Sequence, residues 1–509
     1  MQRGSLTPAK ARGALKPMKI LLCSPPAYIG DRDRHFIQAG SRWSFSIFVR
    51  KGFQEHYMPY PFGLGYSSAL LKASGEHEVV GLDACAADYD EKEFVSRLVK
   101  HSPDLVVADV PTISFPLVLP LLERVKRETN CKVLLTGGHV TELATEVMTS
   151  NPFVDYCALG EYEQTVQKVV DTIAGQRQRS LPEVDGLAFR NNGTVIVNGQ
   201  ISKTYSLDDM PFPDRKDFPV HLYHDFEVAG KPCVQMLTTL GCPYKCTFCM
   251  PIRVMHGDAP LYRRRDPDRI VDEIENVRDV YGAKQLYFDD DTFAVDKGRI
   301  RQMCERMRER HTDVPWTAMG DITLDKRTLE ELSNSDCVGL KFGVESSSAT
   351  TLTEIKKTFV NAERVRRFVR ECQELGIWTH ATFIVGLPGD HAESIEKTIE
   401  FSSDLGLDSV QFSIATPFPG TPFYDQVKKN GWLVTDDWTR YDGANYGVVS
   451  YPWLSNTEIE RLHREALQRW YGHALVQELL SPRRLKRILK AGSFWYSTRK
   501  VLSHLGGTL

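Results

Sequence analysis

The sequence lacks the features that mark several large classes of protein. Its 509 residues carry 63 Lys and Arg against 66 Asp and Glu, and without a basic excess we expect no general binding to nucleic acid. No apolar run approaches the roughly 18 residues that cross a bilayer. The apolar stretch at residues 20–23 is too short for a signal peptide, so residues 1–17 are expected to be a disordered basic tail. These absences favour a large soluble protein of the cytoplasm.

Cysteine is plentiful, and its placement is informative. A reducing cytoplasm argues against disulfides among the eleven cysteines. Cys242, Cys246 and Cys249 follow a C-x₃-C-x₂-C spacing behind Gly241. Cubane iron-sulfur clusters are normally held by four cysteines, so a loop with three leaves one iron open to a substrate or cofactor. This spacing predicts chemistry at the metal rather than plain electron transfer.

Two other interpretations of the cysteine loop stay open. Structural zinc needs four ligands, often as two C-x₂-C pairs or as a cysteine pair with a histidine pair. No second half follows Cys249 within a few tens of residues, and His256 is the nearest candidate for a further ligand. A loop without any metal is the remaining alternative.

The second half of the chain shows a repeated βα pattern. Apolar runs at 338–344 and 378–385 alternate with helix-period stretches at 267–281 and 361–375, which predicts parallel strands in a barrel or an open doubly wound sheet. Polar and glycine residues follow the strands, where active sites of such folds lie. Alternatives are a solvated strand end for the acids at 289–291 and ordinary turns for the glycines at 386 and 389.

The first part of the chain predicts a second α/β unit. Short β-rich runs at 19–23, 78–82, 105–110, 132–136 and 156–159 are separated by helical stretches, as in a doubly wound sheet. The strands end in small or turn-forming residues, so the backbone there can approach a large flat or phosphate-bearing ligand. No Walker loop and no G-x-G-x-x-G occurs in this part, which gives nucleotide binding little support.

The remaining segments connect and follow these units. Residues 176–232 are predicted to be a linker, with a hairpin turn at Asn191-Asn192-Gly193 and an extended stretch at 208–214. Helix-period apolar residues over 457–489 come with a basic cluster at 483–490. A helix packed on the barrel is the default expectation. Peripheral contact of this C-terminal region with an anionic membrane surface or a lipid-like substrate is the alternative.

The cysteine loop and the strand ends resemble the radical S-adenosylmethionine (SAM) superfamily. An aromatic residue, Phe248, precedes the last cysteine, and the segments 285–293, 343–346, 383–390 and 415–422 resemble later strands of the family in the same order. The resemblance covers about residues 230–430. It implies a [4Fe-4S] cluster on Cys242, Cys246 and Cys249. The residues that it implies for SAM are Phe248, Asp290, Glu345, Ser346, Gly386 and Pro388.

The N-terminal unit resembles the cobalamin-binding domain that precedes the barrel in one class of this superfamily. The segments 60–66, 81–84, 103–107, 136–139 and 160–163 carry the resemblance, which covers about residues 18–175. The D-x-H-x-x-G motif is absent, so the axial cobalt ligand stays open. A domain that kept its shape and lost its ligand is the alternative. The residues implied for cobalamin are Pro25, Asp83, Thr112, Ser114, Gly137, Gly138, Gly160 and Glu161.

The resemblances imply a Rossmann-like domain at 18–175, a linker at 176–232, a partial (β/α)₆ barrel at 233–432 and a C-terminal helical region at 433–509. They also imply reductive cleavage of SAM and C-methylation of an unactivated carbon in a small-molecule or lipid-like substrate, with an external electron donor of the flavodoxin or ferredoxin type. Oxidative cyclisation or ring rearrangement, and a nonenzymatic iron-sulfur or cobalamin sensor, are the alternatives. No catalytic side chain is assigned.

Overall fold

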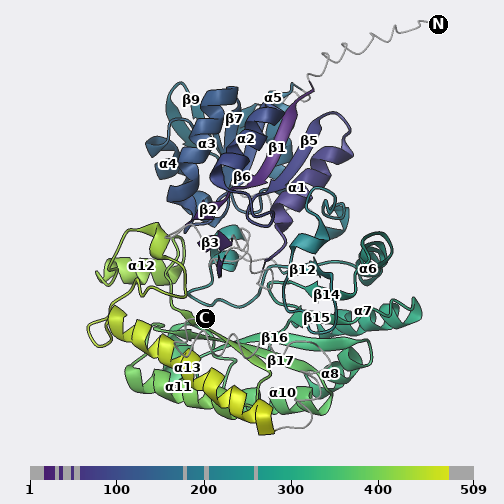
Figure 1. The fold of residues 1–509 in the computed structure, drawn as a ribbon, viewed down its shortest axis with the longest axis vertical. Coiled ribbons are helices and arrows are strands. Elements are labelled where there is room, and N and C mark those ends of the chain that lie inside the picture. The colour runs from purple at the N-terminus through teal and green to yellow at the C-terminus, as the bar shows by residue number, and fades with distance from the viewer. Residues whose placement is uncertain are drawn as a thin grey trace, which may run out of the picture.

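Two sheets, built mainly of parallel strands, lie one above the other in the computed structural model (Figure 1). The structure describes residues 17–28, 34–37, 47–50, 58–175, 180–199, 206–256 and 262–480. Nearly all of the predicted tail at 1–17 lies outside these ranges. The upper unit holds the N-terminal part of the chain, and the lower unit holds the part that follows residue 233. The chain is therefore an α/β protein with two units, as the sequence predicted.

The upper sheet has seven strands in the order β10-β9-β8-β7-β6-β1-β5. Alternate residues of its central strands enter two different cores: Leu22 and Val107 face one, and Leu21 and Val106 face the other. A sheet covered on both faces explains the continuous apolar runs. The five parallel strands are β1 (Lys19–Ser24), β5 (Glu78–Asp83), β6 (Leu105–Asp109), β7 (Lys132–Thr136) and β8 (Tyr156–Ala158). The helices are α1 (Phe62–Ala73), α2 (Glu91–His101), α3 (Phe115–Thr129), α4 (Gly138–Ser150) and α5 (Glu163–Ile173).

The predicted hairpin extends this sheet. Strands β9 (Leu187–Asn191) and β10 (Thr194–Val197) pair antiparallel, and β9 pairs with β8. The turn residues Asn192 and Gly193 have φ angles of 48° and 85°. Positive φ at both positions is what a tight two-residue hairpin turn requires. Part of the segment between the two units is thus the edge of the first sheet.

The lower sheet has six parallel strands in the order β11-β14-β15-β16-β17-β18. Its first and last strands are not hydrogen-bonded to each other, so the barrel is partial, as predicted. The strands are β11 (Cys233–Met236), β14 (Gln285–Phe288), β15 (Trp316–Met319), β16 (Cys337–Glu345), β17 (Trp378–Val385) and β18 (Ser409–Ile414). The helices are α6 (Pro267–Tyr281), α7 (Lys297–Glu309), α8 (Lys326–Ser333), α9 (Ala349–Glu354), α10 (Ala362–Glu374), α11 (Ala392–Asp404) and α12 (Pro422–Lys429).

The long C-terminal helix α13 (Asn456–Leu480) packs on the lower unit along α11 and beside β18. Ile459, Leu462 and Ala466 are buried in this contact, and His463 Nε2 lies 3.0 Å from the carbonyl oxygen of Phe412. The expectation of a helix packed on the barrel is confirmed for this part. The basic cluster at 483–490 lies outside the described residues. None of the described helices has both the length and the apolar character that crossing a membrane would take.

The segment 206–232, called the strap below, connects the two units. It contains the 3₁₀ turns η2 (Leu207–Asp209) and η3 (Val220–Leu222). The prediction of an extended stretch at 208–214 was therefore wrong for residues 208 and 209. Asp214 pairs with Lys72 of α1, and Arg215 donates to the Gln235 carbonyl of β11 at 2.7 Å. The strap therefore fixes the upper unit against the first barrel strand.

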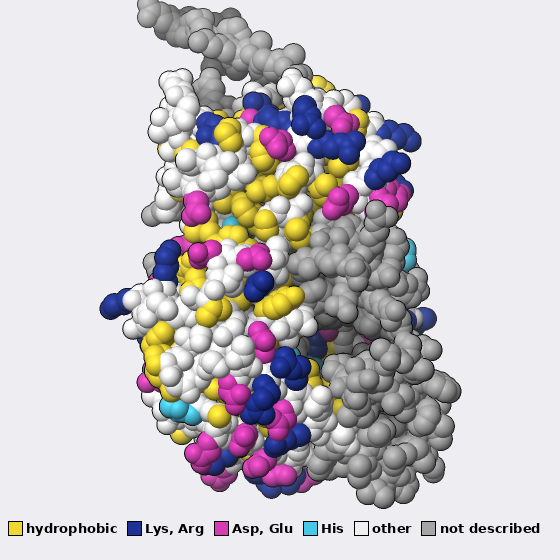
Figure 2. Space-filling model, turned by 60° about the vertical axis from the view of Figure 1, so that its left-hand side comes forward, with side chains coloured by type: hydrophobic (Ala, Val, Ile, Leu, Met, Phe, Trp, Pro, Cys, Tyr) yellow, Lys and Arg dark blue, Asp and Glu magenta, His cyan; other side chains and the backbone are white. Residues whose placement is uncertain are grey.

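A small antiparallel sheet was not predicted from the sequence. It consists of β2 (Ala27–Tyr28), β3 (Arg34–Ile37) and β4 (Ile47–Arg50). On the face drawn in Figure 2, side chains of both charge signs are interspersed over both units, as the balanced composition leads one to expect.

Candidate functional site

The three cysteines lie on a loop between β12 (Thr239–Leu240) and the short π-helix η4 (Pro251–Met255). Cys242 is buried, and Cys246 and Cys249 are half-buried. The loop starts at Gly241, whose φ of 86° favours glycine. The Gly241 amide donates to Asp291 Oδ2 at 2.7 Å, so the acidic end of β14 fixes the start of the loop.

The chemistry of these thiols fits an iron-sulfur cluster. Burial raises the pKa of each thiol, to about 12 for Cys249. The other thiols raise the pKa of Cys242 and Cys249 further. Thiols whose ionisation is opposed in this way become thiolates when a cationic metal centre binds them. Among the described residues, no three His, Cys, Asp or Glu side chains are arranged around a single metal ion. A cluster shared by three cysteines needs no such compact arrangement.

His256 is engaged elsewhere. Its Nδ1 pairs with Glu161, and its Nε2 lies 3.0 Å from Asp291 Oδ2. The nearest candidate for a further zinc ligand thus has both ring nitrogens occupied. His256 is therefore not available as a zinc ligand in this arrangement.

The acids after β14 support the loop rather than face solvent. Asp289 and Asp290 are 1% and 0% exposed, so the solvated-strand-end interpretation was wrong for both. Asp290 accepts hydrogen bonds from the Thr238 amide at 2.6 Å and the Thr239 amide at 3.0 Å. Contact of Asp290 with SAM stays a prediction, and its demonstrated partners belong to the strand that leads into the cysteine loop.

Glu345 is the last residue of β16, and Ser346 follows it directly. Glu345 has a φ of 65°, a conformation that few non-glycine residues adopt. Its carboxylate accepts from Lys357 Nζ at 2.5 Å and from Thr382 Oγ1 at 3.4 Å. A Cβ atom at Gly343 would lie 2.2 Å from Glu345 Oε1, so a side chain here would require this carboxylate to shift. Lys357 was missed by the sequence analysis, since an isolated lysine 12 residues after Glu345 gives no motif signal.

The turn after β17 carries the next two predicted residues, Gly386 and Pro388. Asp390 Oδ2 accepts from the Gly386 amide at 3.1 Å and the Leu387 amide at 3.0 Å. Burial raises the pKa of Asp390 to about 6 against these bonds. Gly386 has a φ of 88°, and its carbonyl accepts from the Tyr451 hydroxyl at 2.9 Å. The structure thus brings Cys249, Phe248, Glu345 and Gly386 to one end of the lower sheet, and SAM binding there remains a prediction.

The residues predicted for cobalamin follow the carboxyl ends of the upper strands, as expected. Gly137 has a φ of 111°, and a Cβ there would lie 3.0 Å from the Val110 carbonyl oxygen. The Gly160 amide donates to Thr141 Oγ1 at 2.9 Å. Asp83 accepts from the Ala86 amide at 3.0 Å, and burial raises its pKa to about 6. The remaining residues of the set lie along the same edge: Pro25, Thr112, Ser114, Gly138 and Glu161.

Two buried polar atoms at this edge support a ligand with hydrogen-bonding groups. Thr136 Oγ1 and His139 Nδ1 have no partner among the described residues. His139 lies between the rings of Phe115 and Trp438, with centroids 4.3 and 5.2 Å away, and burial lowers its pKa to about 3. A neutral imidazole and a free hydroxyl beside paired glycines fit a large cofactor rich in amide groups.

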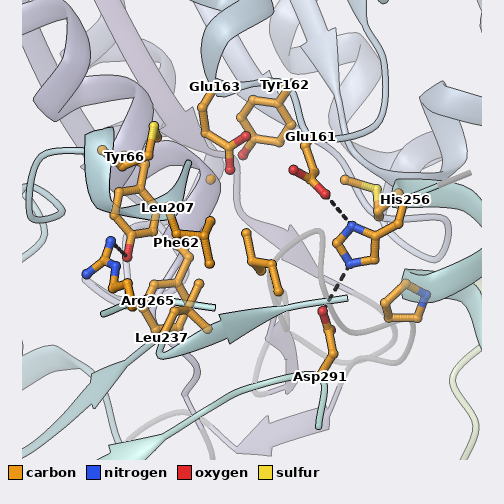
Figure 3. Close-up of a pocket in the computed structure, with 15 residues that line it drawn as sticks. Phe62, Tyr66, Glu161, Tyr162, Glu163, Leu207, Leu237, His256, Arg265 and Asp291 are labelled. Atoms are coloured by element: carbon orange, nitrogen blue, oxygen red, sulfur yellow. Dashed lines mark hydrogen bonds and ion pairs between the residues drawn. The ribbon is translucent and has the colours of Figure 1, made fainter. Parts of the chain in front are cut away.

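The cysteine loop touches this edge directly. A Cβ at Gly138 would lie 2.6 Å from the sulfur of Met250, the residue that follows the last cysteine. Glu161 of the upper unit also pairs with His256 of the lower unit (Figure 3). Arg263 of the lower unit is a second partner of Glu161. The two predicted cofactor sites therefore share a boundary.

The network at this boundary is charged. Burial opposes the ionisation of both His256 and Glu161. Two carboxylates nevertheless raise the pKa of His256 to about 9. His256 and Arg263 together lower the pKa of Glu161 to about 2. Next to it lies a cavity of about 40 Å³ lined by Tyr66, Glu163 and Leu240 among others. Burial and the neighbouring Glu161 raise the pKa of Glu163 to about 7.

A Rossmann-like unit over a partial barrel, with a three-cysteine loop at their junction, defines an enzyme with two adjoining cofactor sites. Residues 236–402 match the Radical SAM superfamily model, and residues 56–170 match the B12 binding domain model. The chain thus combines a domain of the Radical SAM superfamily with a B12 binding domain. Its cofactors are accordingly a [4Fe-4S] cluster, SAM and cobalamin.

Similar proteins support this assignment. The chain is 28% identical to the uncharacterized methyltransferase PH0819 of Pyrococcus horikoshii, over 81% of this chain and 87% of that protein. It is 27% identical to the anaerobic magnesium-protoporphyrin IX monomethyl ester cyclase of Cereibacter sphaeroides, over 75% and 62%. The fold is similar to that of the radical SAM methyltransferase TsrM from Kitasatospora setae, solved with cobalamin and a [4Fe-4S] cluster, with a TM-score of 0.63, 18% identity and coverage of 88% and 85%.

Proposed function

We propose that this protein is a cobalamin-dependent radical SAM methyltransferase that C-methylates an unactivated carbon of a small-molecule or lipid-like substrate. The observation that carries the proposal is the contact between Met250, beside the last cysteine, and Gly138, at the edge expected to hold cobalamin. When bound, the cluster with SAM supplies a 5′-deoxyadenosyl radical and cobalamin supplies a methyl group. Such chemistry requires the two sites to be adjacent.

The chain's own residues would position these groups. Cys242, Cys246 and Cys249 would hold the cluster and leave one iron open. Asp291 holds the start of the loop through the Gly241 amide. Glu345, fixed by Lys357, presents an acceptor at the end of β16, where the family places the SAM ribose and amino acid. The pairing of His256 with Glu161 holds the upper unit over the loop.

Oxidative cyclisation without methyl transfer is the second candidate, because one of the similar proteins is a cyclase. Both reactions would use the same strand ends and the same three cysteines. The mass of the product separates them, since methyl transfer adds one carbon and cyclisation adds none. A nonenzymatic sensor has no support from either family model.

The partners follow from the proposed reaction. A small-molecule substrate has precedent in TsrM, which was solved with a tryptophan substrate. An external flavodoxin or ferredoxin would supply the single electron. The cytoplasm is the proposed location, because none of the eleven cysteines forms a disulfide among the described residues and a reducing compartment protects an open cluster. Peripheral membrane contact would involve the basic residues 483–490, which lie outside the described residues.

Anaerobic turnover with methyl-labelled SAM tests the proposal. The reconstituted protein should form 5′-deoxyadenosine and S-adenosylhomocysteine and transfer label to its substrate. Protein produced without cobalamin should still cleave SAM but transfer no label. A cobalt-free protein that methylates its substrate would rule out the cobalamin role, and an unlabelled product of unchanged carbon count would favour cyclisation.

A further inference from the structure

A buried lysine stands beside the cysteine loop. Lys357 follows α9 and is 8% exposed. Its ammonium lies 2.5 Å from Glu345 Oε1, and a Cβ at Gly343 would lie 2.6 Å from its Nζ atom. Burying an ammonium costs free energy unless it is paired, so Lys357 depends on Glu345 to keep its charge at this position.

The backbone around Lys357 is fixed to the cysteine loop on both sides. Two residues before it, the Ile355 carbonyl accepts from the Thr247 amide at 3.1 Å. Two residues after it, the Phe359 ring stacks on Tyr244 with centroids 4.1 Å apart and planes at 20°. Thr247 and Tyr244 both lie between the first and last cysteines. The segment 355–359 is therefore held against the cysteine loop at both ends, with the cation of Lys357 in its middle.

The position of Lys357 places its charge next to the cysteines. The charged groups that interact electrostatically with the three thiols come from several elements. Lys357 interacts with Cys246 and Cys249, Arg253 and Glu345 interact with Cys246, and Asp291 interacts with Cys242 and Cys249.

We propose that Lys357 is a positioning residue whose fixed charge makes the cluster on Cys242, Cys246 and Cys249 easier to reduce. Each one-electron reduction adds a negative charge to the cluster, and a nearby cation in a poorly solvated site stabilises that state. Glu345 partly offsets the cation and holds it in place. This inference rests on the proposed function, because it assumes the cluster, but it concerns the potential and not the product.

A redox titration of the reconstituted protein tests the inference. Dithionite supplies the electrons, and electron paramagnetic resonance measures the reduced fraction at each potential. In Lys357→Met, the ratio of reduced to oxidised cluster at a fixed potential should fall about tenfold or more, which is about 59 mV for one electron. In Glu345→Gln, the same ratio should rise, because the cation then lacks its counter-charge. Lys357→Arg should stay within about threefold of the wild type.

The opposite signs separate an electrostatic effect from damage to the fold, which would move both variants in one direction. Lys341→Met is the matched control, because Lys341 is a buried lysine on β16, the strand of Glu345, and pairs with Asp225 instead. Its potential should equal that of the wild type. If Lys357→Met loses the cluster, the Glu345→Gln titration alone decides: a rise supports the inference, and no change overturns it.

The outcomes distinguish this inference from the proposed function. An unchanged potential in Lys357→Met with a full complement of iron and sulfide overturns the inference and leaves the function standing. A wild-type protein that binds no cluster on reconstitution overturns the proposed function, and the inference with it.

Discussion

The imidazole of His256 lies 3.0 Å from the carboxylate of Asp291, and Asp291 in turn holds the amide next to the first cysteine. On its other side, His256 pairs with Glu161 of the upper unit. A continuous path of hydrogen bonds therefore runs from the edge of the B12-binding domain to the start of the cysteine loop. The relative position of the two cofactor sites depends on this path as well as on the strap at 206–232.

Replacement of His256 should weaken the junction of the two units. His256→Gln leaves Glu161 with Arg263 alone and removes a buried charge between two carboxylates, which costs about 3–5 kcal/mol when one partner of a buried pair is lost. We expect a lower thermal midpoint of the apoprotein, measured by circular dichroism. His101→Gln is the control, since His101 is exposed at the end of α2. Equal midpoints for both variants would contradict the role of His256.

The same network predicts a pH dependence of stability. The pKa of His256 rises from 6.5 to about 9 on folding, so its contribution is complete below pH 6.5 and is lost as pH rises through 9. The pKa of Glu161 falls from 4.5 to about 2, so its contribution is present above pH 4.5 and is lost as pH falls through 2. Denaturant unfolding between about pH 6.5 and 9.5 should show declining stability, with a shallower decline in His256→Gln. Identical slopes would exclude His256 as the titrating group.

Much of the fold followed from periodicity and turn chemistry. The predicted strands at 132–136 and 378–385 and helix at 267–281 agree with the structure to the residue, because buried parallel strands and capped helices have strong local signals. The small sheet β2-β3-β4 could not be predicted, since its strands are only two to four residues long. The positions of Lys357 and His256 depend on their pairing with Glu345 and Glu161. Such pairings leave no spacing pattern in the sequence.

All three cysteines should be required to hold the cluster. Replacing Cys246 by Ala leaves two thiolates, which is too few to hold the cluster with one open iron. We expect loss of the cluster's visible absorbance and of 5′-deoxyadenosine formation after anaerobic reconstitution. Cys131→Ala is the matched control, because Cys131 is a buried thiol directly before β7, in the upper unit and outside the cysteine loop. A Cys246→Ala protein that still cleaves SAM would refute the assignment.

Gly343 should tolerate no side chain without a loss of SAM binding. In Gly343→Ala, the added methyl would lie 2.2 Å from Glu345 Oε1 and 2.6 Å from Lys357 Nζ. One of these groups must move, because real Cβ atoms essentially never show contacts below 3.0 Å. A shift of either group would disturb the ion pair that fixes Glu345, and we expect about a tenfold weaker affinity for SAM, which corresponds to about 1.4 kcal/mol. Gly199→Ala is the control, since a methyl group at Gly199 would have no atom of the described residues within 4 Å. Calorimetric titration of the cluster-loaded proteins measures both affinities, and equal values would show that SAM binding does not depend on the space beside Gly343.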